Sequence, residues 1–122
     1  MKRLYIFAAA FVLLLTACSK KAYYPVENDG RDWMSTHEHG VVAYVDPYTG
    51  NYIVETNEGF SVVELWGGIE PREYDEEYAY FSNTGIQTIY NYHGDFFTKG
   101  RIVDYWLTWS EALYVIDDLS GR

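Results

Sequence analysis

Short runs of β-branched and aromatic residues, each closed by a turn signal, repeat along residues 41–107 and constrain the fold more than any other feature. Runs of this length between Gly, Pro, Asn and Asp residues are typical of antiparallel strands. The pattern predicts strands at 41–46, 51–56, 60–66, 78–82, 86–92 and 98–107. The turns at 46–51 and 57–59 join the first three runs into a predicted meander. We therefore expect a mainly β, antiparallel domain of about six short strands.

A single helix is predicted after the last strand, at about 109–119. Thr108 and Glu111 have the spacing of a capping box, in which the two residues satisfy each other's free backbone N–H groups. The apolar residues that follow share one helical face: Trp109, Ala112, Leu113, Ile116 and Leu119. We expect this face to cover one end or face of the sheet. The layout resembles a small OB-like or SH3-like barrel, or a sandwich, and such an architecture implies no particular function.

Composition places the chain among folded, acidic, single-domain proteins. The 122 residues suffice for one domain, and a 48% hydrophobic content argues against disorder. Acidic residues outnumber basic ones 18 to 9, which gives a net charge of −9. Non-specific nucleic-acid binding requires an excess of Lys and Arg, so no nucleic-acid partner is expected.

The first 18 residues have the pattern of a secretory signal. A basic head at 1–3 precedes an uncharged run. The segment from Leu4 to Cys18 has only 15 residues, whereas a membrane span needs roughly 20. Leu15, Thr16, Ala17 and Cys18 resemble the bacterial lipobox, and Cys18 is the only cysteine of the chain. This resemblance to bacterial lipoproteins implies cleavage before Cys18, lipid on its thiol and new amino group, and stable attachment to a membrane.

The resemblance divides the chain into three parts: a signal peptide at 1–17, a lipidated cysteine with its tether at 18–40, and a β-rich domain at 41–122. Residues 19–40 show no helical or strand period, although Tyr23, Tyr24 and Trp33 predict that part of this segment packs on the domain. Ser19, Lys20 and Lys21 differ from the residues that retain lipoproteins in the inner membrane or export them to the cell surface. The implied location is the bacterial cell envelope, in the outer membrane and facing the periplasm.

The many tyrosines are the first candidate for a functional surface. Tyr and Trp favour half-exposed positions, where both the ring and its polar group are used. Six of these residues are candidates to line a groove for sugar rings or for a protein partner: Trp66, Tyr74, Tyr78, Tyr80, Tyr90 and Tyr92. The alternative interpretation is that they form the core and rim packing of a small β domain.

Two further groups are weaker candidates for chemistry. An acidic cluster in the predicted loop 67–77 has the oxygen ligands that Ca²⁺ prefers, or the charge to meet a basic partner, although a solvated loop is the default interpretation. Its members are Glu70, Glu73, Asp75, Glu76 and Glu77. His37 and His39 would share a face of an extended chain, and His93 would be needed as a third metal ligand. We expect no metal and no cofactor.

No motif for nucleophilic catalysis or phosphate binding occurs in the sequence. The first hypothesis is therefore a non-catalytic envelope lipoprotein whose anchored β domain binds a protein or a glycan. The alternatives are a small envelope hydrolase or metal-dependent enzyme that uses the histidines and acids, and a structural subunit of an envelope assembly.

Overall fold

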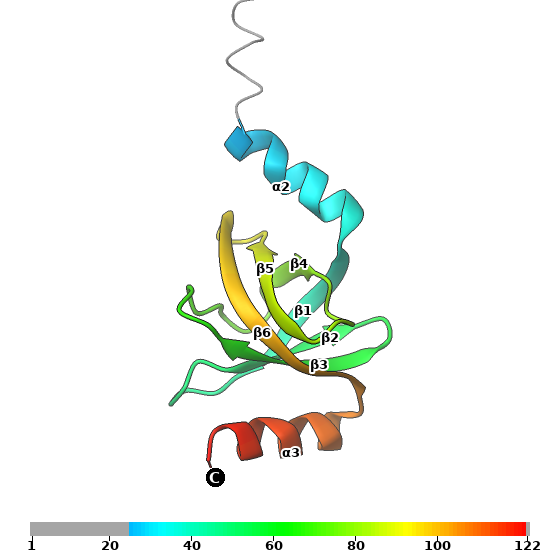
Figure 1. The fold of residues 1–122 in the computed structure, drawn as a ribbon, viewed down its shortest axis with the longest axis vertical. Coiled ribbons are helices and arrows are strands. Elements are labelled where there is room, and N and C mark those ends of the chain that lie inside the picture. The colour runs from blue at the N-terminus through cyan, green and yellow to red at the C-terminus, as the bar shows by residue number, and fades with distance from the viewer. Residues whose placement is uncertain (1–24, 122) are drawn as a thin grey trace, which may run out of the picture. The chain divides into compact units, whose positions relative to one another are not determined.

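The computed structural model describes residues 25–121, and the side chains from Gly30 onward (Figure 1). Cys18, the predicted lipobox at 15–17, Tyr23 and Tyr24 lie outside the described residues. The elements in chain order are α2 Pro25–Thr36, β1 Glu38–Val45, β2 Tyr52–Thr56, β3 Gly59–Leu65, β4 Glu76–Ala79, β5 Gly85–Asn91, β6 Phe96–Leu107 and α3 Trp109–Leu119. Contacts within the chain divide it into two compact units. The second unit, which contains the barrel, starts at Trp33. Neither helix within 25–121 is both long enough and apolar enough to cross a membrane.

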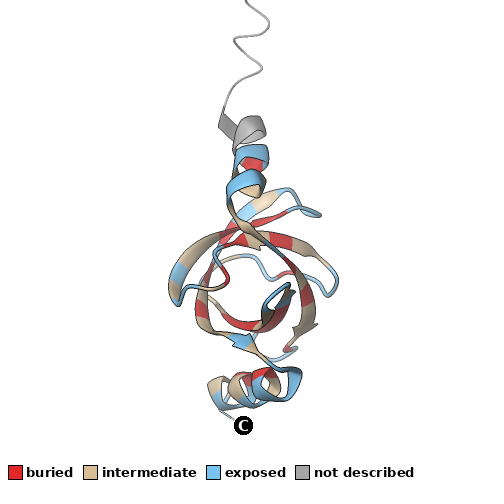
Figure 2. Ribbon diagram, turned by 90° about the vertical axis from the view of Figure 1, so that its right-hand side faces the viewer, coloured by how far each residue is buried: buried red, intermediate tan, exposed pale blue. Residues whose placement is uncertain are grey.

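The six strands pair antiparallel and close into a barrel in the order β1-β2-β3-β6-β5-β4. Pairing of β4 with β1 completes the ring, which is seen end-on in Figure 2. The predicted mainly β fold with one C-terminal helix is therefore confirmed, and its strands form a barrel. Closure pairs the two strands that would otherwise be open edges of the sheet.

Alternating residues of each strand fill the barrel interior, as the period of two in a strand requires. On β5, for example, Ile89 and Asn91 are buried inside, while Ile86 is exposed outside. The interior core contains Val42, Tyr52, Val54, Val63, Ala79, Phe81, Ile89 and Ile102.

Helix α3 covers part of the outer surface and forms a second core there. Ile53 and Val62 point outward from β2 and β3 and are buried with Ala112 and Ile116 of the helix. The predicted capping box is confirmed: the Glu111 N–H donates to Thr108 Oγ1 over 3.2 Å, and the Thr108 N–H donates to Glu111 Oε1 over 2.9 Å.

The structure corrects several predicted boundaries. Residues 25–36 of the predicted tether form α2, and β1 starts at Glu38 rather than at 41. Strand β4 is Glu76–Ala79, not 78–82, because its four residues pair with the early part of β1 at Glu38–Val41. The predicted 67–77 loop is correspondingly shorter. Strand β6 starts two residues early, at Phe96, since it pairs with the whole of β5.

Candidate functional site

The predicted aromatic surface is not one continuous groove. Tyr78 and Tyr90 lie directly opposite each other on β4 and β5, and Tyr80 and Tyr92 are exposed on either side. Tyr74 lies on the preceding loop, 78% exposed, and makes no ring contact with any residue in the described range. Trp66 follows β3 and lines a separate hollow. The structure therefore brings four of the six predicted residues onto one outer face of the barrel.

The end of α2 covers part of this tyrosine face. The Trp33 indole N–H donates to the carbonyl of Tyr78 over 2.8 Å, and its ring meets the Phe97 ring edge-on at 5.4 Å. His37 stacks on Trp33 at 3.8 Å and lies 4.1 Å from the ring of Tyr80. The predicted packing of Trp33 onto the domain is confirmed, and it leaves less aromatic surface free for a ligand.

The five predicted loop acids are dispersed rather than gathered around a cation. Glu76 and Glu77 belong to β4 and point to opposite sides of the barrel wall, so the prediction that both lie in a loop is wrong. Asp75 accepts a hydrogen bond from the Asn91 amide, and Glu73 accepts one from the Val45 N–H. Glu70 remains exposed.

Two of the three histidines, His39 and His93, contact Glu76, and His37 lies apart from them. His39 Nε2 lies 2.8 Å from Glu76 Oε1, and the Glu76 N–H donates to His93 Nδ1 over 3.0 Å. His37 is held by Trp33, as described above. No group of three His, Cys, Asp or Glu side chains close enough to hold a metal ion occurs within the part of the chain that the structure describes.

Glu77 is a carboxylate that is fully buried inside the barrel. Tyr52 donates its hydroxyl to Oε1 over 2.9 Å, and Asn91 donates its amide to Oε2 over 3.2 Å. Burial raises the pKa of Glu77 to about 7, although these two hydrogen bonds favour the charged form and lower the pKa in part. Burial beside Glu77 also raises the pKa of Tyr52. The Asn91 amide also donates to Asp75 over 2.9 Å, so one amide connects the two carboxylates.

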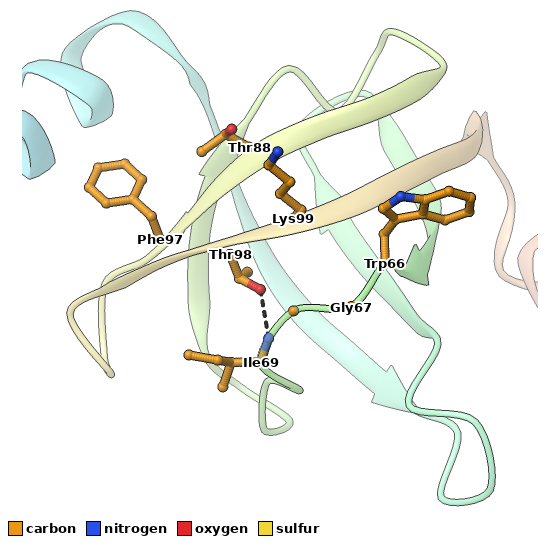
Figure 3. Close-up of a pocket in the computed structure, with 8 residues that line it drawn as sticks. Trp66, Gly67, Ile69, Thr88, Phe97, Thr98 and Lys99 are labelled. Carbon is orange, nitrogen blue, oxygen red and sulfur yellow. Dashed lines mark hydrogen bonds between the residues drawn. The ribbon is translucent and has the colours of Figure 1, made fainter.

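One hollow among the described residues lies outside β5 and β6, beneath the loop that follows β3 (Figure 3). Its volume is about 410 Å³, within the range of small-ligand sites. Figure 3 shows Phe97 and Trp66 on opposite sides, with Lys99 and Thr88 between them. The lining residues are Trp66, Gly67, Gly68, Ile69, Thr88, Phe97, Thr98 and Lys99.

Local geometry explains why the loop crosses β6 so closely. The Ile69 N–H donates to Thr98 Oγ1 over 2.7 Å, which fixes the loop to the strand. A Cβ on Gly68 would lie 1.9 Å from Thr98 Oγ1 and 3.0 Å from the backbone nitrogen of Lys99. Only glycine therefore fits at position 68, and the loop that carries Trp66 is held against the strand that carries Phe97 and Lys99.

The charge of Lys99 distinguishes this hollow from the rest of the barrel. Residues 33–121 contain fifteen acidic side chains and only three basic ones, Arg72, Lys99 and Arg101. Arg101 pairs with Glu64 at 2.6 Å, whereas Lys99 forms no ion pair with any residue in the described range. An unpaired cation and the Thr88 hydroxyl thus lie between two half-exposed rings.

Sequence reasoning identified Trp66 but not Phe97, Lys99 or Thr88. On β6, residues 97 and 99 share a face because they are two apart, and Lys99 pairs with Thr88 in the ladder to β5. The Gly67-Gly68 pair was the only local signal of a close backbone approach.

Comparisons of the chain with protein-family models, with curated proteins and with solved structures find no match. The residues of the site are therefore the only basis for assigning a function.

Proposed function

We propose that the protein is a non-catalytic lipoprotein of the bacterial cell envelope and that its barrel binds a glycan in the hollow beside Trp66. The observation that carries the proposal is the arrangement of two exposed rings around polar groups. Trp66 is 46% exposed, and neither it nor Phe97 belongs to the interior core. Phe97 is 38% exposed, although its ring also contacts Trp33 and Tyr90. Rings held open to solvent in a ligand-sized hollow are typical of binding sites.

A sugar ring matches this arrangement in shape and in polarity. Its C–H faces are apolar and pack on an aromatic ring, while its edge carries hydroxyl groups that need hydrogen-bond partners. Lys99 supplies donors and Thr88 supplies both a donor and an acceptor between the rings. A flat protein interface would bury a larger and more continuous surface than this hollow offers.

The site contains no group that suggests turnover of the ligand. Glycosidases cleave the glycosidic bond with a pair of carboxylates, and the lining of this hollow contains no carboxylate. A glycan held here would be bound and not cleaved.

Titration of the full chain in detergent with soluble peptidoglycan fragments tests the binding proposal, with the heat of binding measured by isothermal titration calorimetry as the signal. We expect Trp66→Ala to weaken binding at least tenfold, because the stacking surface is removed. Tyr74→Ala is the matched control, since Tyr74 is an exposed aromatic residue of the same loop outside the hollow, and its affinity should equal that of the wild type. Absence of binding by the wild type, or equal binding by Trp66→Ala, would refute the proposal.

The anchor is tested separately in cells by labelling with radioactive palmitate. We expect the wild-type protein to be labelled, cleaved and recovered in the outer-membrane fraction. Cys18→Ala should remain unlabelled and keep its signal peptide, because the cysteine accepts the lipid. A labelled Cys18→Ala protein would contradict the lipoprotein assignment and leave the glycan site untouched.

A further inference from the structure

Trp106, near the end of β6, has a backbone conformation that a large side chain rarely adopts. Its φ angle is +58°, in the left-handed region where a Cβ is crowded by the backbone. The strand bulges here: Leu107 pairs with Phe60 and Asp104 pairs with Val62, so two residues of β6 face one residue of β3. The bulge reorients the indole, and conformations of this kind are concentrated at functional sites.

A chain of hydrogen bonds holds the indole in place without burying it. The Trp106 Nε1–H donates to Ser82 Oγ over 3.0 Å, and Ser82 donates both its hydroxyl and its N–H to the Glu38 carboxylate, each over 3.0 Å. The Trp106 side chain nevertheless remains 60% exposed. A ring that served packing would be covered, whereas this one is fixed and presented to solvent.

Two further rings belong to residues near the bulge: Phe60 follows Gly59 and packs against the core beneath α3, and Trp109 begins α3. Phe60 and Trp109 meet edge-on at 5.1 Å, and Trp109 is also exposed. The turn passes under Trp106 so closely that a Cβ on Gly59 would lie 3.2 Å from the Trp106 Cα. We call Trp106, Phe60 and Trp109, together with this turn, the Trp106 surface.

The charges around the Trp106 surface are all of one sign. Glu58 lies in the turn, Glu38 holds Ser82, and α3 carries only acidic charges. The three basic residues of 33–121 are elsewhere: Arg72 and Lys99 line hollows near the other end of β6, and Arg101 is paired with Glu64. A complementary partner therefore carries positive charge and has groups that pack on an indole.

We propose that the Trp106 surface docks an arginine-rich segment of a protein partner. A guanidinium group stacks on the exposed face of an indole and is attracted by its π electrons, and the neighbouring carboxylates add charge complementarity. Seven residues of β6 separate Lys99 from Trp106, which corresponds to about 23 Å along the strand. The surface is thus distinct from the glycan hollow, and the two ligands can be bound together.

The test uses the full chain, labelled with ¹⁵N in detergent, and a synthetic hexa-arginine peptide. The indole N–H of Trp106 is identified as the resonance that is lost in Trp106→Gly. Addition of the peptide should shift this resonance and leave that of Trp66 unchanged, and the shift should diminish as salt is raised. A shift of the Trp66 resonance alone, or an equal response to hexa-glutamate, would overturn the proposal.

Trp106→Gly also separates docking from packing, because glycine accepts the left-handed backbone without strain. We expect the melting temperature to be unchanged or raised and the affinity for the peptide to fall at least fivefold. Tyr114→Ala is the control: Tyr114 is 76% exposed on the equally acidic α3, and its loss should leave the affinity unchanged. A melting temperature lowered by more than about 5 °C would assign Trp106 to packing and overturn the proposal. Wild-type affinity of Trp106→Gly for the peptide would also overturn the proposal.

Discussion

The same strands of the barrel carry two hydrophobic cores that differ in one respect. The core beneath α3 is closed by apolar side chains alone, with Ile53, Val62, Ala112 and Ile116 fully buried at its centre. The interior core has apolar residues in its centre but includes the buried carboxyl of Glu77, which is bonded to Tyr52 and Asn91.

The two cores therefore differ in how their stability should respond to pH and to substitution. The four fully buried residues beneath α3 carry no ionisable group, so their burial is insensitive to pH and tolerates similar side chains. The buried carboxyl requires each of its partners, and it costs free energy whenever it is ionised. Stability of the interior core should therefore depend on pH, whereas stability of the α3 core should not.

The largest expected effect is the loss of a large side chain from either core. Phe81→Ala inside the barrel should lower the free energy of unfolding by about 4 kcal/mol, and Ile116→Ala beneath α3 by about 3 kcal/mol, because each leaves a cavity among fully buried neighbours. Urea unfolding of the full chain in detergent measures both values. A cost below about 1 kcal/mol for Ile116→Ala would show that α3 is only loosely attached to the barrel. The core beneath α3 would then not be comparable with the interior core.

The second prediction separates the cores by pH. The pKa of Glu77 is raised from 4.5 to about 7, so the folded state binds a proton that the unfolded state has released. The stability from this group is fully present below pH 4.5 and is lost as the pH rises to about 7, a fall of about 3 kcal/mol. Glu77→Gln keeps a neutral group that bonds to Tyr52 and Asn91, so this decrease should disappear.

Urea unfolding at several pH values between 4.5 and 7.5 checks this prediction. Ile116→Ala serves as the control, since it should lower stability by a constant amount and keep the pH profile of the wild type. If Glu77→Gln and the wild type gave parallel profiles, the buried carboxyl would have no role in the difference between the cores.

Local signals were sufficient for much of this fold. The three-strand meander and the capping box were predicted because turn residues and a Thr-Glu pair act over a few neighbouring positions. Helix α2 was missed because it has Gly30 in its interior and few apolar residues. Its C-terminal end is held by Trp33, which bonds to Tyr78, 45 residues away.

The site was less predictable, because the pairing of distant strands assembles it. Trp66 and Lys99 meet only because β3 pairs with β6, and nothing near either residue in the sequence indicates that partner. The side of the barrel wall that each of the adjacent residues Glu76 and Glu77 faces depends in the same way on the register of β4 against β1. A shift of one residue would exchange their sides.

The smallest expected effect concerns the N-terminal cap of α3, the helix that covers the outer core. Thr108→Ala removes the side-chain oxygen that accepts the Glu111 N–H and should lower the free energy of unfolding by about 1 kcal/mol at every pH above 5. Thr108→Ser keeps that oxygen and should restore nearly all of the loss. Equal destabilisation by both substitutions would mean that the Thr108 methyl group, rather than the cap, stabilises the helix.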